Sequence, residues 1–141
     1  MSTRSAIGYK LPSGRIKAVY CHWDGYPKHH LPILIEHYNT LDKVKALIKP
    51  GFMSSLRTEE VWCRDAKRDP QPLYYHERGD GDPPQVSASL KAAHKWWDNW
   101  CCEHMYIFEP DIGWLHYDLR KPLPTETLQF KKLNELLSSV L

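Results

Sequence analysis

Two short runs of alternating hydrophobic and polar residues open the chain. The first run extends from Arg4 to Lys10 and the second from Ile16 to His22. Between them lies Leu11-Pro12-Ser13-Gly14-Arg15, in which proline fixes its own φ angle and glycine can adopt a positive one. Two alternating runs joined by such a turn are typical of an antiparallel β-hairpin, and we expect one here.

Hydrophobic residues then recur at helical spacing. Four of them fall at positions i, i+3, i+4 and i+7, which predicts the buried stripe of an amphipathic helix. They are Leu31, Leu34, Ile35 and Tyr38. Pro32 fits the first turn of this helix, where its missing N–H has no cost. A second helix follows, with Thr40 as its N-cap and a stripe formed by Leu41, Val44, Leu47 and Ile48.

The second half of the chain shows the same alternation of patterns. A helix is predicted from Ser87 to Cys102. Met105 to Phe108 and Trp114 to Tyr117 form a second predicted hairpin, around a turn that contains Pro110 and Gly113. A last helix is expected within residues 122–141, where it could be an appendage to the domain.

These elements predict an α+β fold. A small antiparallel sheet built of hairpins, with three to four helices packed mainly on one face, would bury the hydrophobic stripes. A chain of 141 residues has room for one core, so residues 1–141 are expected to form a single domain. The pattern is poor from Phe52 to Val86, and the Gly-Asp-Pro-rich segment 79–86 is expected to be a mobile loop.

The composition excludes several classes of protein. The chain has 19 basic and 17 acidic residues, which is no strong nucleic-acid signature. It has no apolar run long enough to span a membrane, and its start has no apolar signal segment. Its four cysteines form no Cys-x-x-Cys pair, so we expect reduced thiols in a cytoplasmic protein. His29, His30 and His37 could complete a metal site with His22 and Asp24, but no spacing matches a known ligand pattern, so we expect no metal site and no cofactor.

The segment from Tyr20 to Pro27, Tyr-Cys-His-Trp-Asp-Gly-Tyr-Pro, is the strongest candidate for a site. It falls where a predicted strand gives way to a loop, which is a common place for functional residues. His22 and Asp24 could act as an acid–base pair, whereas Trp23 and Tyr26 could stack on a flat ligand. Alternatively, Asp24 caps the turn through its own backbone and His22 packs beside it.

Two arginines could join this candidate site. The predicted hairpin brings Arg4 close to Asp24, either as a clamp for a phosphate or carboxylate group or as half of a structural ion pair. Arg78 could approach from the middle loop as part of a lid, or it could belong to a solvated charged loop. Trp96, Trp97 and Trp100 cover more than one helix face, so they either pack between helices or form an exposed patch for a protein partner.

The chain resembles a family of small uncharacterised proteins that are encoded mostly by tailed bacteriophages and prophages. The resemblance rests on Ser2-Thr3-Arg4-Ser5 with Ile7-Gly8, and on the Tyr20 to Pro27 motif. It continues more loosely in Glu36-His37-Tyr38, in Ser54-Ser55-Leu56, in Tyr75 to Asp80 and in the closing hairpin up to about Tyr117. His76 and Glu77 depart from the family pattern. The resemblance implies a phage protein in the cytoplasm of an infected bacterium and implies no reaction.

Two functions of different classes fit these residues. The first is an accessory binding protein that acts on a host bacterial protein, or sequesters a small nucleotide-like anion, through Arg4, His22, Trp23, Asp24, Tyr26 and Arg78. The second is a small hydrolase of a nucleotide or phosphodiester, with His22 as the acid or base and Asp24 beside it. The absence of a recognisable catalytic motif favours binding, and whether the chain forms a homo-oligomer stays open.

Overall fold

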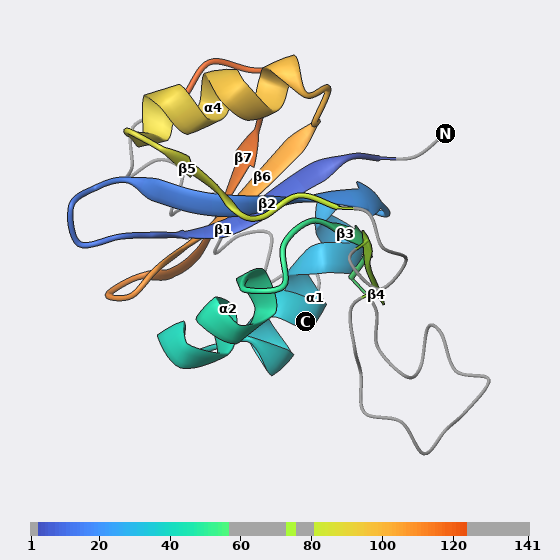
Figure 1. The fold of residues 1–141 in the computed structure, drawn as a ribbon, viewed down its shortest axis with the longest axis vertical. Helices are drawn as coiled ribbons and strands as arrows, with labels where there is room; N and C mark the ends of the chain where they lie inside the picture. Colours follow the sequence, from blue (N-terminus) through green and yellow to red (C-terminus); the bar gives the residue numbers. More distant parts are fainter. Residues whose placement is uncertain (1–2, 57–72, 76–80, 124–141) are drawn as a thin grey trace.

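A β-hairpin forms the centre of the fold (Figure 1). The structure is a computed structural model, and it describes residues 3–56, 73–75 and 81–123. Strand β1 (Ser5–Lys10) pairs antiparallel with β2 (Ile16–Trp23), so that Ser5 lies opposite Cys21 and Lys10 opposite Ile16. The hairpin predicted from the alternating pattern is therefore confirmed.

The sheet around this hairpin is mixed, with the strand order β4-β3-β2-β1-β6-β7. Strands β6 (His104–Glu109) and β7 (Gly113–Asp118) form the second predicted hairpin, and β6 runs parallel to β1. On the other side, β3 (Met53–Ser55) runs parallel to β2. The expectation of an antiparallel sheet built only of hairpins was wrong, because alternation within a strand does not specify which distant strand pairs with it.

Two short strands complete the sheet within the described residues. Strand β4 (Leu73–Tyr74) pairs with β3, and β5 (Gln85–Ser87) pairs with the first half of β2. The end of the segment 79–86, expected as a mobile loop, therefore contributes to the sheet. The helix expected within 122–141 lies outside the described residues, apart from positions 122 and 123.

The helices cover both faces of the sheet. Figure 1 shows α4 (Leu90–Asn99) on one side, and α1 (Pro27–His37) and α2 (Leu41–Ile48) on the other. On β1, the Ser5 side chain reaches His30 of α1. On β2, Tyr20 points to the opposite face and contacts Trp100 at the end of α4. Packing mainly on one face was therefore a wrong expectation.

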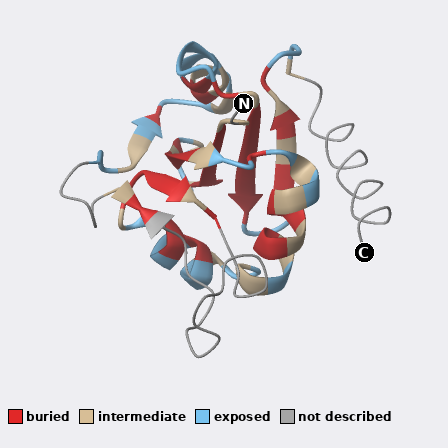
Figure 2. Cartoon of the chain, turned by 90° about the vertical axis from the view of Figure 1, so that its right-hand side faces the viewer, coloured by how far each residue is buried: buried red, intermediate tan, exposed pale blue. Residues whose placement is uncertain are grey.

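The reason is visible in the central strand. Every residue of β1 from Ser5 to Tyr9 is buried, so both faces of the strand need a cover. Figure 2 shows the buried positions along the strands and on the inward sides of the helices. None of the helices in the described ranges has the length and apolarity to cross a membrane.

Helix α1 begins earlier than its hydrophobic stripe suggested. Pro27 occupies its first turn, and Pro32 lies inside the helix rather than at its start. Leu31 and Leu34 are fully buried, as predicted, whereas Ile35 and Tyr38 are partly buried against the core. The indole N–H of Trp114 donates to the carbonyl oxygens of Leu34 (3.1 Å) and Tyr38 (2.9 Å) and thereby ties the end of α1 to β7.

The other two described helices begin at side-chain caps. The Thr40 hydroxyl accepts a hydrogen bond from the Lys43 amide at the start of α2, as predicted. The Ser89 hydroxyl accepts from the Ala92 amide at the start of α4. The helix ends at Asn99 and is therefore shorter at both ends than the predicted span from Ser87 to Cys102. Trp97 is the large residue of α4 that is buried in the core.

Truncation of Leu34 tests the packing of α1. We expect Leu34→Ala to lower the free energy of unfolding by about 2–5 kcal/mol, because it removes a fully buried side chain where Trp114 holds the helix in place. Urea denaturation followed by circular dichroism measures the change. Glu36→Ala, at an exposed position of the same helix, is the control and should change the value by less than about 0.5 kcal/mol. Equal effects of the two substitutions would contradict the packing described here.

Candidate functional site

The turn after β2 is held in place by its glycine. Asp24 has a positive φ of 56°, and Gly25 is buried. The Gly25 amide donates to the Thr3 carbonyl (2.7 Å), and its own carbonyl accepts from the Tyr106 hydroxyl (2.6 Å). A Cβ atom on Gly25 would lie 2.6 Å from the Ser5 Cβ and from the Thr3 oxygen, so a larger residue cannot fit without displacing β1.

This turn brings the start of β1 next to the end of β2. Arg4 immediately precedes β1, and the register that pairs Ser5 with Cys21 places Arg4 beside His22. The Tyr20 hydroxyl and the His22 Nδ1 atom form a hydrogen bond of 2.6 Å. Burial and the nearby Arg4 charge both lower the pKa of His22, while burial raises the pKa of Tyr20 to about 12. Both side chains are therefore uncharged at neutral pH.

Aromatic rings extend from this point across the face that α4 covers. The His22 ring makes an edge contact with Trp23 (centroids 4.6 Å apart), and Tyr20 contacts Trp100 (5.8 Å). Phe52 joins Tyr20 and Trp100 to the buried Trp97. We call the group of Arg4, Tyr20, His22, Trp23 and Trp100 the Arg4 surface.

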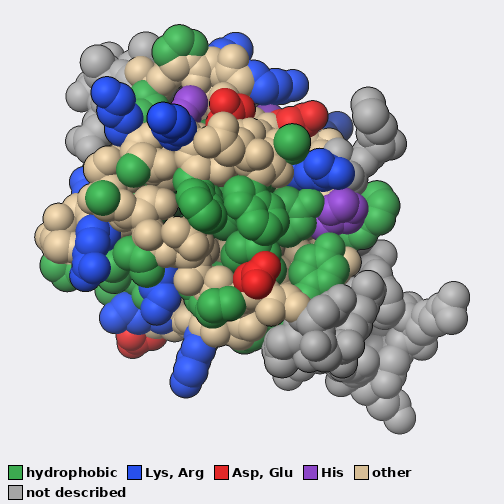
Figure 3. Space-filling model, turned by 45° about the horizontal axis from the view of Figure 1, so that its top comes forward, with side chains coloured by type: hydrophobic (Ala, Val, Ile, Leu, Met, Phe, Trp, Pro, Cys, Tyr) green, Lys and Arg blue, Asp and Glu red, His purple; other side chains and the backbone are tan. Residues whose placement is uncertain are grey.

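The Arg4 surface has an exposed part. Trp23 is 48% exposed and Trp100 is 40% exposed, although both rings contact the cluster. Figure 3 shows hydrophobic side chains gathered in a band on this side of the molecule, with a histidine beside it. Large aromatic side chains that are half-exposed provide flat apolar area for a ligand or partner.

The remaining residues of the predicted site lie differently. Asp24 is exposed, and no ion pair joins it to Arg4 in the described ranges. Tyr26 is the N-cap of α1 and contacts His29 (6.0 Å), whose ring bonds to the Leu56 carbonyl. Arg78 lies outside the described residues. The structure therefore brings together Arg4, His22 and Trp23. Among the described residues, neither Asp24 nor Tyr26 forms a hydrogen bond or ion pair with Arg4.

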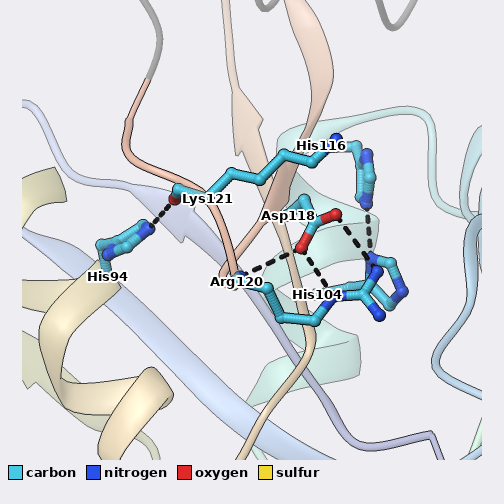
Figure 4. A network of polar contacts seen from close by, with 6 residues as sticks. All are labelled: His94, His104, His116, Asp118, Arg120 and Lys121. Atoms are coloured by element: carbon cyan, nitrogen blue, oxygen red, sulfur yellow. Dashed lines mark hydrogen bonds and ion pairs between the residues drawn. The ribbon is translucent and has the colours of Figure 1, made fainter.

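A second polar cluster lies on the face of the sheet that is opposite α4, and the sequence pattern did not predict it (Figure 4). His104 Nδ1 and His116 Nε2 lie 2.8 Å apart. The Asp118 carboxylate accepts hydrogen bonds from the backbone amide and the guanidinium of Arg120, and these bonds lower its pKa to about 2. The register of β6 and β7 assembles this cluster, and nothing in the spacing of its residues indicated it.

Burial keeps these histidines neutral. It lowers the pKa of His104 and lowers that of His116 to about 3. Figure 4 also shows His94 of α4, whose Nε2 atom lies 3.0 Å from the carbonyl oxygen of Lys121. The described residues contain no group of three or more ligands that could hold a metal ion.

A third histidine is enclosed completely. His30 Nε2 lies 3.0 Å from the Ser5 hydroxyl, and His30, Ser5 and Cys21 are all fully buried. Burial places the pKa of His30 well below its ordinary value and raises that of Cys21 to about 12. A thiol in that state is not a nucleophile at neutral pH. Among the described cysteines, which are all free, Cys21 and Cys102 are buried and Cys101 is exposed.

Comparison with known proteins finds no matching family model, no matching curated protein and no matching solved structure. The function of this chain is therefore inferred from the geometry of its described residues.

The neutral His104–His116 pair makes stability depend on pH. In the unfolded chain His116 binds a proton near its ordinary pKa of about 6.5, whereas in the folded protein it stays neutral down to about 3. Between these values protons bind preferentially to the unfolded chain, so stability falls as the pH is lowered. We expect His116→Gln to reduce this loss, as measured by urea denaturation midpoints at about pH 7 and about pH 4.

His37→Asn is the control for this measurement, because His37 lies partly exposed at the end of α1. This variant should lose as much stability on acidification as the original protein. An unchanged pH dependence in His116→Gln would show that the buried pair is protonated without cost in the folded protein.

Proposed function

We propose that this chain is a binding protein that sequesters a small anionic, nucleotide-like ligand on the Arg4 surface. The observation that carries the proposal is the position of Arg4. Its charge is close enough to Tyr20 and His22 to influence the pKa values of both. No carboxylate pairs with it in the part of the chain that the structure describes. A guanidinium of this kind, set beside aromatic rings, suits a phosphate or carboxylate group.

The hydrogen bond between Tyr20 and His22 supports an anionic ligand. Because burial keeps the phenol protonated, Tyr20 can donate to Nδ1 of the neutral imidazole. This tautomer of His22 carries its proton on Nε2, which makes that atom a hydrogen-bond donor. Arg4 and His22 then offer two donors on one surface, and an anion accepts from both.

The exposed rings would hold the flat part of the ligand. Trp23 and Trp100 lie at opposite ends of the aromatic contacts through His22 and Tyr20. Stacking of a nucleobase on an aromatic side chain contributes roughly 1–3 kcal/mol per base. A nucleotide combines a ring with an anionic group and matches both features of the Arg4 surface.

Hydrolysis of a nucleotide or phosphodiester at the same site is the alternative function. The observation that favours it is the lowered pKa of His22, since a neutral imidazole is required for a general base. Two observations on the described residues favour binding instead. Tyr20 already occupies Nδ1, and Asp24 makes no hydrogen bond to His22 that would orient the ring.

A host bacterial protein is the other occupant to consider. Trp96 (39% exposed) and Val86 (42% exposed) are further large hydrophobic residues at the surface, on α4 and β5. Tryptophan and arginine are frequent among the residues that dominate protein interfaces. A nucleotide-like ligand and a host protein are both compatible with the expectation of a phage protein that acts in an infected bacterium.

Substitution of Arg4 and Trp23 tests the proposal. Adenosine triphosphate, adenosine monophosphate, adenosine and inorganic phosphate are titrated while intrinsic tryptophan fluorescence is recorded. We expect the nucleotides to bind more tightly than adenosine or phosphate alone. Arg4→Ala and Trp23→Ala should each weaken nucleotide binding by about tenfold or more. The first substitution removes the guanidinium that binds the anionic group, and the second removes a ring that stacks on the nucleobase. The melting temperature should change little, since both side chains are partly or largely exposed.

Arg15→Ala and Trp96→Ala are the matched controls. Arg15 bonds to Ser13 at the far turn of the hairpin, and Trp96 is exposed without belonging to the Arg4 surface. Both controls should bind nucleotide as the original protein does. If no nucleotide binds, or if Arg4→Ala unfolds the protein, the Arg4 surface serves the fold or a protein partner instead.

A turnover assay separates binding from hydrolysis. We expect no release of phosphate or nucleoside from the bound nucleotide over hours, with or without added Mg²⁺ or Mn²⁺. We also expect Tyr20→Phe to weaken binding, because His22 loses the partner that fixes its tautomer. Product formation that is abolished by His22→Asn and retained in the control Arg15→Ala would instead establish the hydrolase.

A further inference from the structure

A pocket of about 410 Å³ lies at the other end of the β1–β2 hairpin from the Arg4 surface. Arg4 precedes β1 and Lys10 ends it, so the two places are separated by the length of the strand, roughly 20 Å. The pocket lies where the turn after β1, the turn after β6 and the helix α2 meet. Its volume falls within the range of sites for small molecules.

The topology explains why a pocket forms here. Strands β1 and β6 are neighbours and run parallel, so their carboxyl ends open at the same edge of the sheet. Lys10 and Glu109 are the last residues of these two strands, and they form an ion pair of 3.0 Å in the pocket wall. The space beyond the carboxyl ends of parallel strands is a frequent place for ligands in α/β proteins.

The walls are largely apolar. Leu11 and Pro12 come from the first turn, Leu41 comes from α2, and Ile112 comes from the β6–β7 turn. Ile112 is 43% exposed, although it stands beside other apolar side chains. Tyr9 also lines the pocket, and burial raises the pKa of its hydroxyl, so this group stays neutral. An apolar group of a ligand could cover Ile112 and the facing leucines.

Two charges of opposite sign complete the lining. Lys45 belongs to α2 and Asp111 to the β6–β7 turn, so different elements contribute them to the pocket lining. Neither side chain forms an ion pair with another residue of the described ranges. Because Lys10 and Glu109 neutralise one another, the remaining lining offers one cation and one anion to a ligand.

We propose that this pocket binds a small zwitterion with an apolar body, the chemistry of an apolar α-amino acid. The ligand carboxylate would pair with Lys45 and its ammonium group with Asp111. Its hydrocarbon side chain would pack among Leu11, Leu41 and Ile112. This binding site is independent of the Arg4 surface and requires nothing of the function proposed there.

Titration with L-leucine and its analogues tests the site. Binding is followed through amide chemical shifts in the ¹⁵N-labelled full chain. L-Leucine should give saturable shifts in residues 9–12, 41–45 and 109–112. 3-Methylbutylamine lacks the carboxylate, and 4-methylpentanoate lacks the ammonium group. Each analogue should bind about tenfold more weakly or worse, because one charge of the pocket is left unpaired. L-Serine, which has no apolar body, should not bind.

Substitutions then assign the two charges. Lys45→Met should abolish the preference for L-leucine over 3-methylbutylamine, and Asp111→Asn should abolish the preference over 4-methylpentanoate. Lys49→Met and Asp98→Asn change exposed charges outside the pocket and are the matched controls. The amide spectrum of each variant verifies its fold. Unsaturable shifts with L-leucine, equal binding of the three compounds, or unchanged preferences in the two pocket variants would each overturn the proposal.

Discussion

The close approach of Gly25 to the start of β1 is the contact on which the site depends. Its amide and carbonyl bond to Thr3 and Tyr106, so one residue connects the chain start, the end of β2 and the strand β6. The absence of a side chain permits this approach, because a Cβ atom would overlap Ser5 and Thr3. The position of Arg4 beside His22 and the starting point of α1 both follow from this anchor. A ligand site at the end of a hairpin needs such a constraint, since an unsupported turn would not hold its side chains in one arrangement.

The same contact explains why the Tyr20 to Pro27 motif has two roles. Cys21 and Gly25 are buried, and Pro27 begins α1, so these residues specify the fold. Trp23 is exposed and His22 is partly exposed on the side that carries Arg4. The motif is therefore a fold signature that also presents a surface.

Local patterns predicted the local elements well. Alternation and turn chemistry specified both hairpins, and the spacing of Leu31 and Leu34 identified the buried side of α1. The pairing of β1 with β6 could not be predicted, because about two thirds of the chain lies between the two strands and no short turn joins them. Coverage of both sheet faces was missed for a related reason. Gly8 and Ala18 lie opposite each other in the β1–β2 pair and are both buried, but residues this small do not show a buried face in the sequence pattern.

The candidate site was predictable to the extent that it is local. Arg4, His22 and Trp23 share one end of one hairpin, and the hairpin was correctly identified. Tyr20 and Trp100 were not assigned to the site, since the contact between them requires α4 to lie over β2. The pocket beyond Lys10 and Glu109 was equally hidden, because it exists only when β6 lies parallel to β1. The side chains around the two ends of β1 therefore differ. Aromatic rings and a guanidinium surround its start, and aliphatic side chains with balanced charges surround its end. Because the chemistry differs so much between the two ends, the two ligands that we propose are unlike.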